Sequence, residues 1–288
     1  MPTSAASQDS RTAWLFLTPA LLLLGVFVGF PILYLVVLSF TTGSFTRSGL
    51  QWVGSQNYQR LLTDPDVGQV IGNTLYFTIG TVIPSLVLPL LLAVGLNRAI
   101  ALQGILRTAY FIPSVTSLVA TGLGFRWLFQ TDGPVNALLG VAGISPIAWL
   151  SSTPWAMVVL IVLSSWKQLG FNLVVFLAGL QTIPVSLYEA ARLDGAGRWQ
   201  TFWYITLPCL RPTLVFAAVT TTIFTLRSFE QPYVITGGGP LNSTNLLVFY
   251  IYNQAFAQFD WGYAAAAATL LLGVAIALVY LQLRTSNS

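Results

Sequence analysis

The sequence predicts an all-α protein that crosses a membrane several times. Hydrophobic residues make up 55% of its 288 residues and charged residues only 7%, which is too few charges to cover the surface of a globular protein in water. The apolar residues occur in six blocks of roughly twenty residues or more. As a helix, each block is long enough to cross the ~30 Å of hydrocarbon in a bilayer. Spans and loops use up the chain, so we expect residues 1–288 to form a single transmembrane domain in a lipid bilayer.

The six expected spans can be placed directly on the sequence. In order, they cover residues 13–40, 73–96, 108–130, 155–180, 209–230 and 262–283. The first is too long for the core of a signal peptide and contains no A-x-A cleavage site, so we expect it to be retained. Prolines within or at the ends of spans can kink the helices and free backbone carbonyl groups. They are Pro19, Pro31, Pro84, Pro89 and Pro113.

The distribution of arginine predicts the orientation of these spans. An even number of spans places both termini on one side of the membrane. Basic residues gather at the termini and in the second and fourth loops, at Arg11, Arg98, Arg107, Arg192, Arg198, Arg211 and Arg284. The opposite loops hold chiefly Arg47 and Arg60, close to two aspartates. Because cytoplasmic loops carry the excess of Lys and Arg, we expect both termini in the cytoplasm.

Composition also excludes several kinds of chemistry. Cys209 is the single cysteine and histidine is absent, so we expect neither a disulfide nor a metal site. No G-x4-G-K-[ST] phosphate loop occurs, and any ATP must therefore be hydrolysed by another chain. The basic residues are scattered singly and form no run that would bind nucleic acid. No catalytic constellation is visible, and we expect a chain that is not an enzyme.

A short polar segment, residues 183–208, separates the fourth and fifth spans. Pro184 fits the first turn of a helix, and Ser186 and Glu189 have the S-x-x-E spacing of a capping box. The glycines within residues 194–197 predict the end of that helix and a turn, and a second helix is expected from about Arg198 to Thr206. The alternative is that Glu189 merely caps a helix and the alanines that follow it are helix filler.

The same segment contains the spaced pattern E-A-A-x3-G-x9-I-x-L-P. It resembles the EAA loop of membrane-spanning subunits of ATP-binding-cassette importers, which folds as short cytoplasmic helices and docks into a cleft of the ATPase subunit. The resemblance implies a coupling role for Glu189, Ala190, Ala191, Asp194, Gly195, Ile205, Leu207 and Pro208.

The resemblance covers most of the chain. Residues 125–129, 166–172, 176–181, 237–240 and 259–264 are similar to the first permease subunit of carbohydrate importers, the group related to maltose, lactose and glycerol-3-phosphate permeases. It implies a type I importer permease fold in a bacterial or archaeal cytoplasmic membrane. The implied partners are a second related permease, two ATPase subunits that bind ATP and Mg, and an extracytoplasmic substrate-binding protein. The implied function is half of an alternating-access pathway for a di- or oligosaccharide.

The fourth span carries an unusual polar face. Placed at 100° per residue, its members fall within an arc of about 160°; they include Ser164, Lys167, Gln168, Phe171 and Asn172. Lys167 lies near mid-membrane, where a charge costs at least ~2.5 kcal/mol and should face a polar cavity or a carboxylate. Hydroxyl and amide groups beside an aromatic ring suit a sugar. The alternative is that Lys167 pairs with Glu230 or with a second subunit and holds the bundle together.

Polar residues at helical spacing in the fifth span can line the same cavity. They are Thr221, Thr225, Arg227, Ser228 and Glu230. The alternatives are that the hydroxyl groups bond back to their own helix, and that Arg227 and Glu230 neutralise each other.

Two other functions stay open at this point. An ion-coupled secondary transporter would also have broken helices and buried polar residues, but intramembrane carboxylates are scarce and Glu230 is the nearest candidate for an ion site. An importer of glycerol-3-phosphate or glycerophosphodiesters is the second alternative, because Lys167 and Arg227 would tolerate an anionic cargo.

Overall fold

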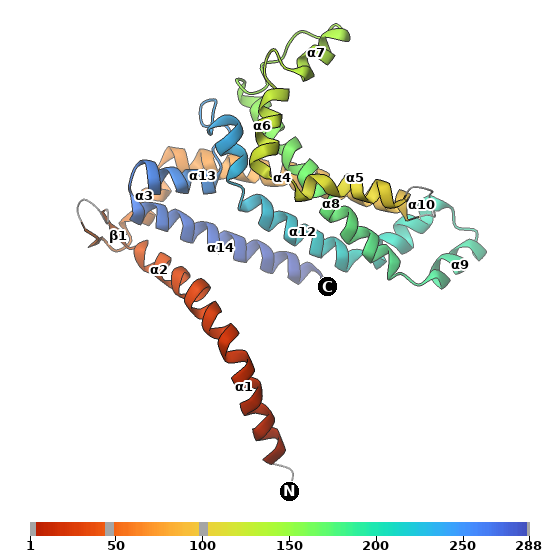
Figure 1. The fold of residues 1–288 in the computed structure, drawn as a ribbon, viewed down its shortest axis with the longest axis horizontal. Helices are drawn as coiled ribbons and strands as arrows, with labels where there is room; N and C mark the ends of the chain where they lie inside the picture. Colours follow the sequence, from red (N-terminus) through yellow and green to blue (C-terminus); the bar gives the residue numbers. More distant parts are fainter. Residues whose placement is uncertain (1–3, 44–48, 98–102, 287–288) are drawn as a thin grey trace. The chain divides into compact units, whose positions relative to one another are not determined.

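The computed structural model describes residues 4–43, 49–97 and 103–286, which are mostly helical and include one small β-hairpin (Figure 1). Strands β1 (Thr41–Thr42) and β2 (Gln51–Trp52) pair antiparallel, with Thr41 opposite Trp52. The contacts within the chain define two compact units, Met1–Asp64 with Ile251–Leu272, and Pro65–Tyr250 with Gly273–Ser288. The single transmembrane domain expected from the sequence stays a prediction.

Four helical stretches in the described part of the chain are long and apolar enough to cross a membrane. They cover Trp14–Leu38, Pro65–Leu96, Thr153–Gln181 and Trp261–Arg284. Two pairs of helices pass the same test together but are bent, by 102° between Thr108–Val115 and Leu118–Leu128, and by 66° between Arg198–Cys209 and Arg211–Leu226. The total reaches six if each bent pair counts as one span. The third and fifth spans expected from the sequence are therefore the broken ones.

The first unit begins with α1 (Ser4–Leu24), a π-helical turn η1 (Gly25–Gly29) and α2 (Phe30–Leu38). After the hairpin comes α3 (Gln56–Thr63). The last segment of this unit holds the end of α13 (Leu247–Tyr252), η4 (Asn253–Ala257) and the first half of α14 (Trp261–Ser286).

Polar contacts tie the segment around α3 to the start of α14. Arg60 forms an ion pair with Asp260, with an Nη1–Oδ2 distance of 2.6 Å, and its guanidinium group lies 4.0 Å from the ring centre of Tyr263. The Tyr263 hydroxyl group donates to Asp64 at 2.7 Å. Because the ring of Tyr263 is fully buried, these contacts hold two segments that are distant in the sequence as one unit.

In the second unit, the long helix α8 (Thr153–Gln181) packs against α4 (Pro65–Leu96), α5 (Gln103–Val115) and α12 (Arg211–Leu226). Leu173, Phe176 and Leu180 of α8 form the centre of an apolar core with Ala93 and Ala217 of the neighbouring helices. Gly170 lets α5 approach closely, because a Cβ atom there would overlap the carbonyl oxygen of Tyr110.

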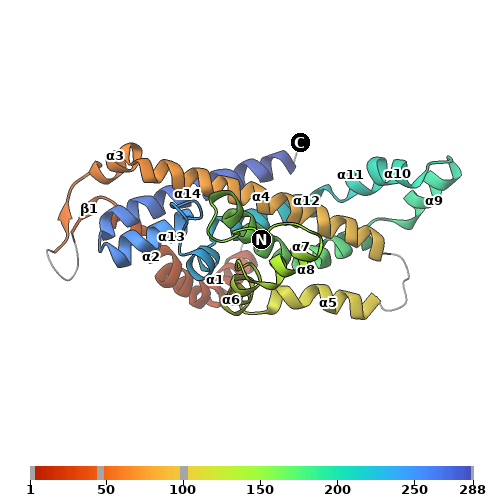
Figure 2. The same cartoon turned by 90° about the horizontal axis from the view of Figure 1, so that it is seen from above.

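The remaining elements of this unit are shorter. They are α6 (Leu118–Leu128), α7 (Pro134–Val141), α9 (Val185–Leu193), α10 (Arg198–Thr201), η2 (Phe202–Thr206), α11 (Leu207–Cys209) and η3 (Pro232–Thr236). In both views, α9 and α10 lie beyond the C-terminal end of α8 (Figures 1 and 2). These two helices form the hairpin that the sequence predicts between the fourth and fifth spans.

Candidate coupling hairpin and membrane-embedded polar groups

The first arm of the hairpin starts differently from the prediction. Helix α9 begins at Val185 with Pro184 as its N-cap, and no side chain caps it. The first turn closes through the Leu187 N–H, which donates to the Pro184 carbonyl oxygen at 3.2 Å. The expected capping box is therefore wrong: the extended backbone of Pro184 (ψ 130°) starts the helix before Ser186, so Ser186 lies inside the first turn.

The turn between the two arms is as the glycines predict. Gly195 has a left-handed backbone, with φ +76°. Its N–H donates to Arg192 O at 3.1 Å and that of Ala196 to Ala191 O at 2.9 Å. This pair of bonds is the Schellman motif that satisfies the last carbonyl groups of a helix. Gly195 therefore sets the direction of the second arm.

The second arm combines three short helical segments. Helix α10 begins at Arg198, and Gln200 Oε1 accepts a hydrogen bond of 2.8 Å from the Gly197 N–H. This cap was not among the predicted features, although a glutamine three residues after a turn glycine is a signal for it. Ile205 lies in the π-helical segment η2, and Leu207 and Pro208 lie in α11, so the expected second helix is confirmed and continues three residues further.

The hairpin has two different faces. Glu189 and Ala190 are exposed, as are Asp194 and Leu193, the latter with 89% of its surface open. Ala191 is buried against the protein. The large apolar side chains Trp199 and Tyr204 are exposed on the second arm. An exposed helix face with apolar side chains and carboxylates is suited to contact another protein.

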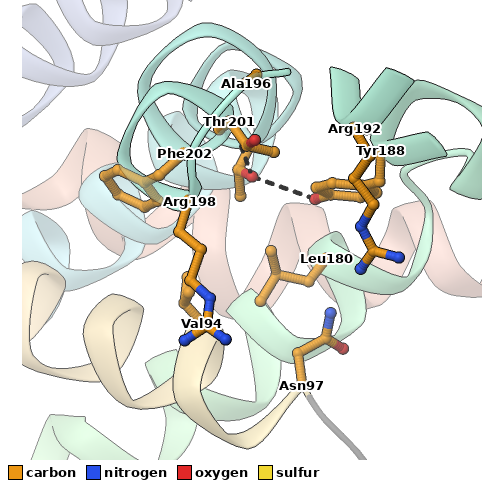
Figure 3. A pocket seen from close by; sticks show the side chains of 10 residues that line it. Val94, Asn97, Leu180, Tyr188, Arg192, Ala196, Arg198, Thr201 and Phe202 are labelled. Carbon is orange, nitrogen blue, oxygen red and sulfur yellow. Dashed lines mark hydrogen bonds between the residues drawn. The ribbon is translucent and has the colours of Figure 1, made fainter. Parts of the chain in front are cut away.

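The inner face of the hairpin borders a cavity of about 700 Å³ (Figure 3). Its lining is Val94, Asn97, Leu180, Tyr188, Arg192, Ala196, Arg198, Thr201, Phe202 and Thr206. The Tyr188 hydroxyl group lies 3.3 Å from Thr206 Oγ1 and so connects the two arms. Arg192 and Arg198 extend from different arms toward Val94, Leu180 and Asn97 (Figure 3), and no carboxylate is among the described residues that line the cavity.

The polar face of the fourth span is buried in α8, and Asn172 shows what it does there. Its Nδ2 atom donates to the Ser85 carbonyl oxygen at 2.6 Å and to Thr221 Oγ1 at 3.1 Å. Pro89 has no N–H, so the carbonyl group of Ser85, four residues earlier, cannot form its bond within α4. The side chain of Asn172 therefore replaces a backbone hydrogen bond that proline removes.

Lys167 has the same role as Asn172: it donates to a backbone carbonyl oxygen, here at the break in the third span. Its Nζ atom donates to the carbonyl oxygen of Thr116, and Thr116 Oγ1 lies 3.4 Å away. In return, the Ser114 hydroxyl group donates to the Lys167 carbonyl oxygen at 2.9 Å. Thr116 lies between α5 and α6, where the chain bends by 102°. Lys167 therefore forms this bond, and no ion pair with Glu230.

The other predicted pathway residues of α8 divide into two groups. Ser164 and Gln168 are buried, and Ser164 Oγ accepts from Gln231 Nε2 at 3.2 Å. Phe171 is 38% exposed and does not share the buried face. Gln231 was not among the predicted residues; it lies beyond the end of α12 and is buried. The signal that could have identified it is its position next to Ser228 and Glu230, which were predicted to line the cavity.

In the fifth span, the back-bonding alternative is confirmed for two hydroxyl groups. Thr225 donates to Thr222 O at 2.9 Å and Ser228 to Phe224 O at 3.3 Å. Helix α12 ends at Leu226, four residues before the expected end of the span. Arg227 and Glu230 follow that end and are exposed. A cavity of about 330 Å³ is lined by Phe224, Arg227, Ser228, Phe229, Glu230 and Gln231.

Residues 74–285 match the family of the binding-protein-dependent transport system inner membrane component. The chain belongs to this family, and it is a multi-pass protein of the inner membrane. The resemblance to permease subunits of ATP-binding-cassette importers is confirmed.

Two relatives and one solved structure match almost the whole chain. The lactose transport system permease protein LacF of Rhizobium radiobacter is 39% identical, over 98% of this chain and 97% of the relative. The arabinooligosaccharides transport system permease protein AraP of Bacillus subtilis is 36% identical, over 96% of this chain and 88% of the relative. A bacterial ABC transporter involved in the import of the acidic polysaccharide alginate contains a chain with the same fold, at a TM-score of 0.84 and 25% identity, with 99% of each chain covered. These relatives are transport subunits, so the expectation that the chain is not an enzyme is confirmed.

Proposed function

We propose that this chain forms half of the pathway by which a di- or oligosaccharide enters the cell through an ATP-binding-cassette importer. The support is that the relatives named above carry carbohydrates: lactose, arabinooligosaccharides and, for the solved structure, alginate. The cytoplasmic termini predicted from arginine distribution place the hairpin on the side where ATP is available.

The proposed partners follow from this function. The family description, a binding-protein-dependent transport system, supports a substrate-binding protein as one partner, which we place outside the membrane. A second related permease completes the pathway, and two ATPase subunits bind ATP and Mg, so this chain itself needs no cofactor. Transport then proceeds by alternating access, in which ATP closes the ATPase dimer and draws the hairpins of the two permeases together.

The observation that carries the coupling proposal is the two-faced hairpin. Its outer face presents Glu189 and Ala190 to solvent, and its turn is fixed by the left-handed Gly195. A bend that is held by satisfied backbone bonds transmits force better than a flexible loop would. Ala190 has a small side chain, which lets a partner approach the helix closely. Asp194 is exposed beside the turn.

For the cargo, we propose that the exposed polar groups after α12 are the contacts rather than the buried ones of α8. Arg227 and Glu230 line one cavity, and Lys167 and Asn172 already hold neighbouring backbone groups. An arginine beside a glutamate gives the cavity wall no net charge, which suits a neutral sugar better than glycerol-3-phosphate. The same carboxylate is the group that an ion-coupled transporter would need, so Glu230 is the residue at which the two mechanisms differ.

Site-specific crosslinking tests the coupling proposal. A photoreactive group at position 189 of the full chain should crosslink to an ATPase subunit in intact membranes. The control is a group at Leu62, which is exposed like Glu189 but lies in α3 and should give no such product. Crosslinks from 189 to lipid alone, with ATPase-independent uptake that follows an ion gradient and requires Glu230, would favour the secondary transporter instead.

A further inference from the structure

The cavity on the inner face of the hairpin carries two positive charges that the proposed coupling does not use. Arg192 comes from the end of α9 and Arg198 from the start of α10. Both line the cavity together with the amide group of Asn97 and the hydroxyl group of Tyr188. All four side chains can donate hydrogen bonds, and the described residues of the lining include no carboxylate. The chemistry of the lining therefore selects an anion.

The cavity lies where two spans end. Val94 belongs to the last turn of α4 and Leu180 to the last turn of α8, and both face the cavity (Figure 3). Apolar side chains at the ends of spans lie at the level where lipid chains meet their head groups. The volume of about 700 Å³ is within the range of sites that hold small molecules.

The two faces of α9 separate this cavity from the surface assigned to the ATPase. Tyr188 and Arg192 are one helical turn apart and both line the cavity. Glu189, Ala190 and Leu193 are exposed on the outer side. Tyr188 and Arg192 are four residues apart, as are Glu189 and Leu193, so each pair lies along its own line of the helix surface. A ligand in the cavity and a protein on the outer face can therefore contact the hairpin at the same time.

We propose that this cavity binds a phosphate group, and that its source is the head group of an anionic phospholipid. Guanidinium groups bind phosphate through paired, charge-assisted hydrogen bonds, and basic pockets between spans on the cytoplasmic side are sites for anionic head groups. Val94 and Leu180 contact the first carbons of the lipid chains. Free phosphate has the same chemistry but lacks those apolar contacts.

Such a lipid would connect the two arms of the hairpin, because Arg192 and Arg198 lie on opposite sides of the turn. Its consequence for transport rests on the proposed coupling function: without the lipid, the hairpin is held less firmly and less of the ATP hydrolysed is converted into uptake. The binding itself does not depend on that function.

The test uses the complete transporter, purified through a tag on this chain and stripped of lipid. Native mass spectrometry measures the binding of phosphatidylglycerol, phosphatidylcholine and inorganic phosphate to the wild type, to the double variant Arg192→Gln/Arg198→Gln and to Arg284→Gln. Arg284 is a matched control, because it lies in the last turn of α14, is exposed and does not line the cavity.

We expect phosphatidylglycerol to bind more tightly than phosphatidylcholine, and the double variant to weaken that binding about 30-fold while Arg284→Gln leaves it unchanged. Competition by inorganic phosphate at similar concentration would support the phosphate site and identify free phosphate as its source. Equal binding of phosphatidylglycerol to the wild type and the double variant would overturn the proposal. So would loss of the ATPase subunits from the double variant with lipid binding intact, because the two arginines would then face the ATPase. A lipid-binding result is independent of whether the hairpin couples to ATP, so the two proposals fail separately.

Discussion

Two polar regions of the second unit look alike in the sequence and differ in the structure. The polar face of α8 is buried, and its members Lys167 and Asn172 are held by backbone carbonyl groups of neighbouring helices. The outer face of the hairpin is exposed, and Glu189 on that face is open to solvent. A polar side chain inside a membrane protein is therefore not by itself evidence for a substrate.

The comparison explains why a buried span carries polar side chains. Proline and helix breaks release carbonyl groups that lipid cannot satisfy. In this chain Pro89 releases one in α4, and the 102° bend after α5 releases another at Thr116. Helix α8 carries the side chains that satisfy both. The hairpin has no such need, because Gly195 and the backbone bonds around it satisfy the ends of its helices.

The largest expected effect is in the buried region. In Gly170→Ala the new Cβ atom would overlap the Tyr110 carbonyl oxygen, and because a backbone atom cannot move aside easily we expect a loss of about 3 kcal/mol of stability or more. This would exceed the ~1 kcal/mol that alanine gains over glycine in a helix. The measurement is size-exclusion chromatography after heating. Gly197→Ala is the hairpin control: it has φ −70° and ordinary contact distances, and as an N-cap change it should cost no more than about 1 kcal/mol.

A substitution in the hairpin should affect transport without affecting folding. Gly195→Pro cannot keep φ +76°, since proline fixes φ near −65°, and it also removes the N–H that bonds to Arg192 O. We expect uptake to fall by at least about tenfold while membrane insertion and ATP hydrolysis persist. Gly195→Ala keeps the N–H and only strains the backbone, by ~1–2 kcal/mol, so it should retain part of the uptake. Unchanged uptake in both variants would remove the hairpin from the coupling mechanism.

Substitution of Lys167 should have an intermediate effect, and it tests whether the buried polar face of α8 is structural. Lys167→Met keeps much of the side-chain volume but leaves the Thr116 carbonyl oxygen without its donor, at an expected cost of about 1–3 kcal/mol. Lys167→Arg keeps a donor and should recover most of the stability. Transport kinetics separate the two roles: a structural residue should lower the amount of folded transporter, whereas a cargo contact should raise the KM for sugar. A raised KM with normal stability in Lys167→Met would return Lys167 to the substrate pathway.

Patterns along the chain predicted the hairpin more closely than the interior. The apolar blocks located the spans, and the glycines around Gly195 located the turn, because both depend on local sequence. The start of α9 was missed because proline can end an extended segment as well as begin a helix. The role of Asn172 was also missed, since its acceptor belongs to Ser85, 87 positions earlier in the chain. A contact of that kind depends on how the helices pack, which the pattern of a single span does not contain.

The smallest expected effect concerns how the break in the third span is held. Ser117 is the N-cap of α6, and its Oγ atom accepts from the Ala120 N–H at 3.5 Å, which is long for a hydrogen bond. Ser117→Ala should therefore cost about 0.5 kcal/mol, at the low end for loss of an N-cap, and less than Lys167→Met in the same thermal assay. If the two variants cost the same, the break is held by its own cap as much as by α8. Polar groups of α8 would then support the bundle less than their contacts indicate, and the contrast with the hairpin would weaken.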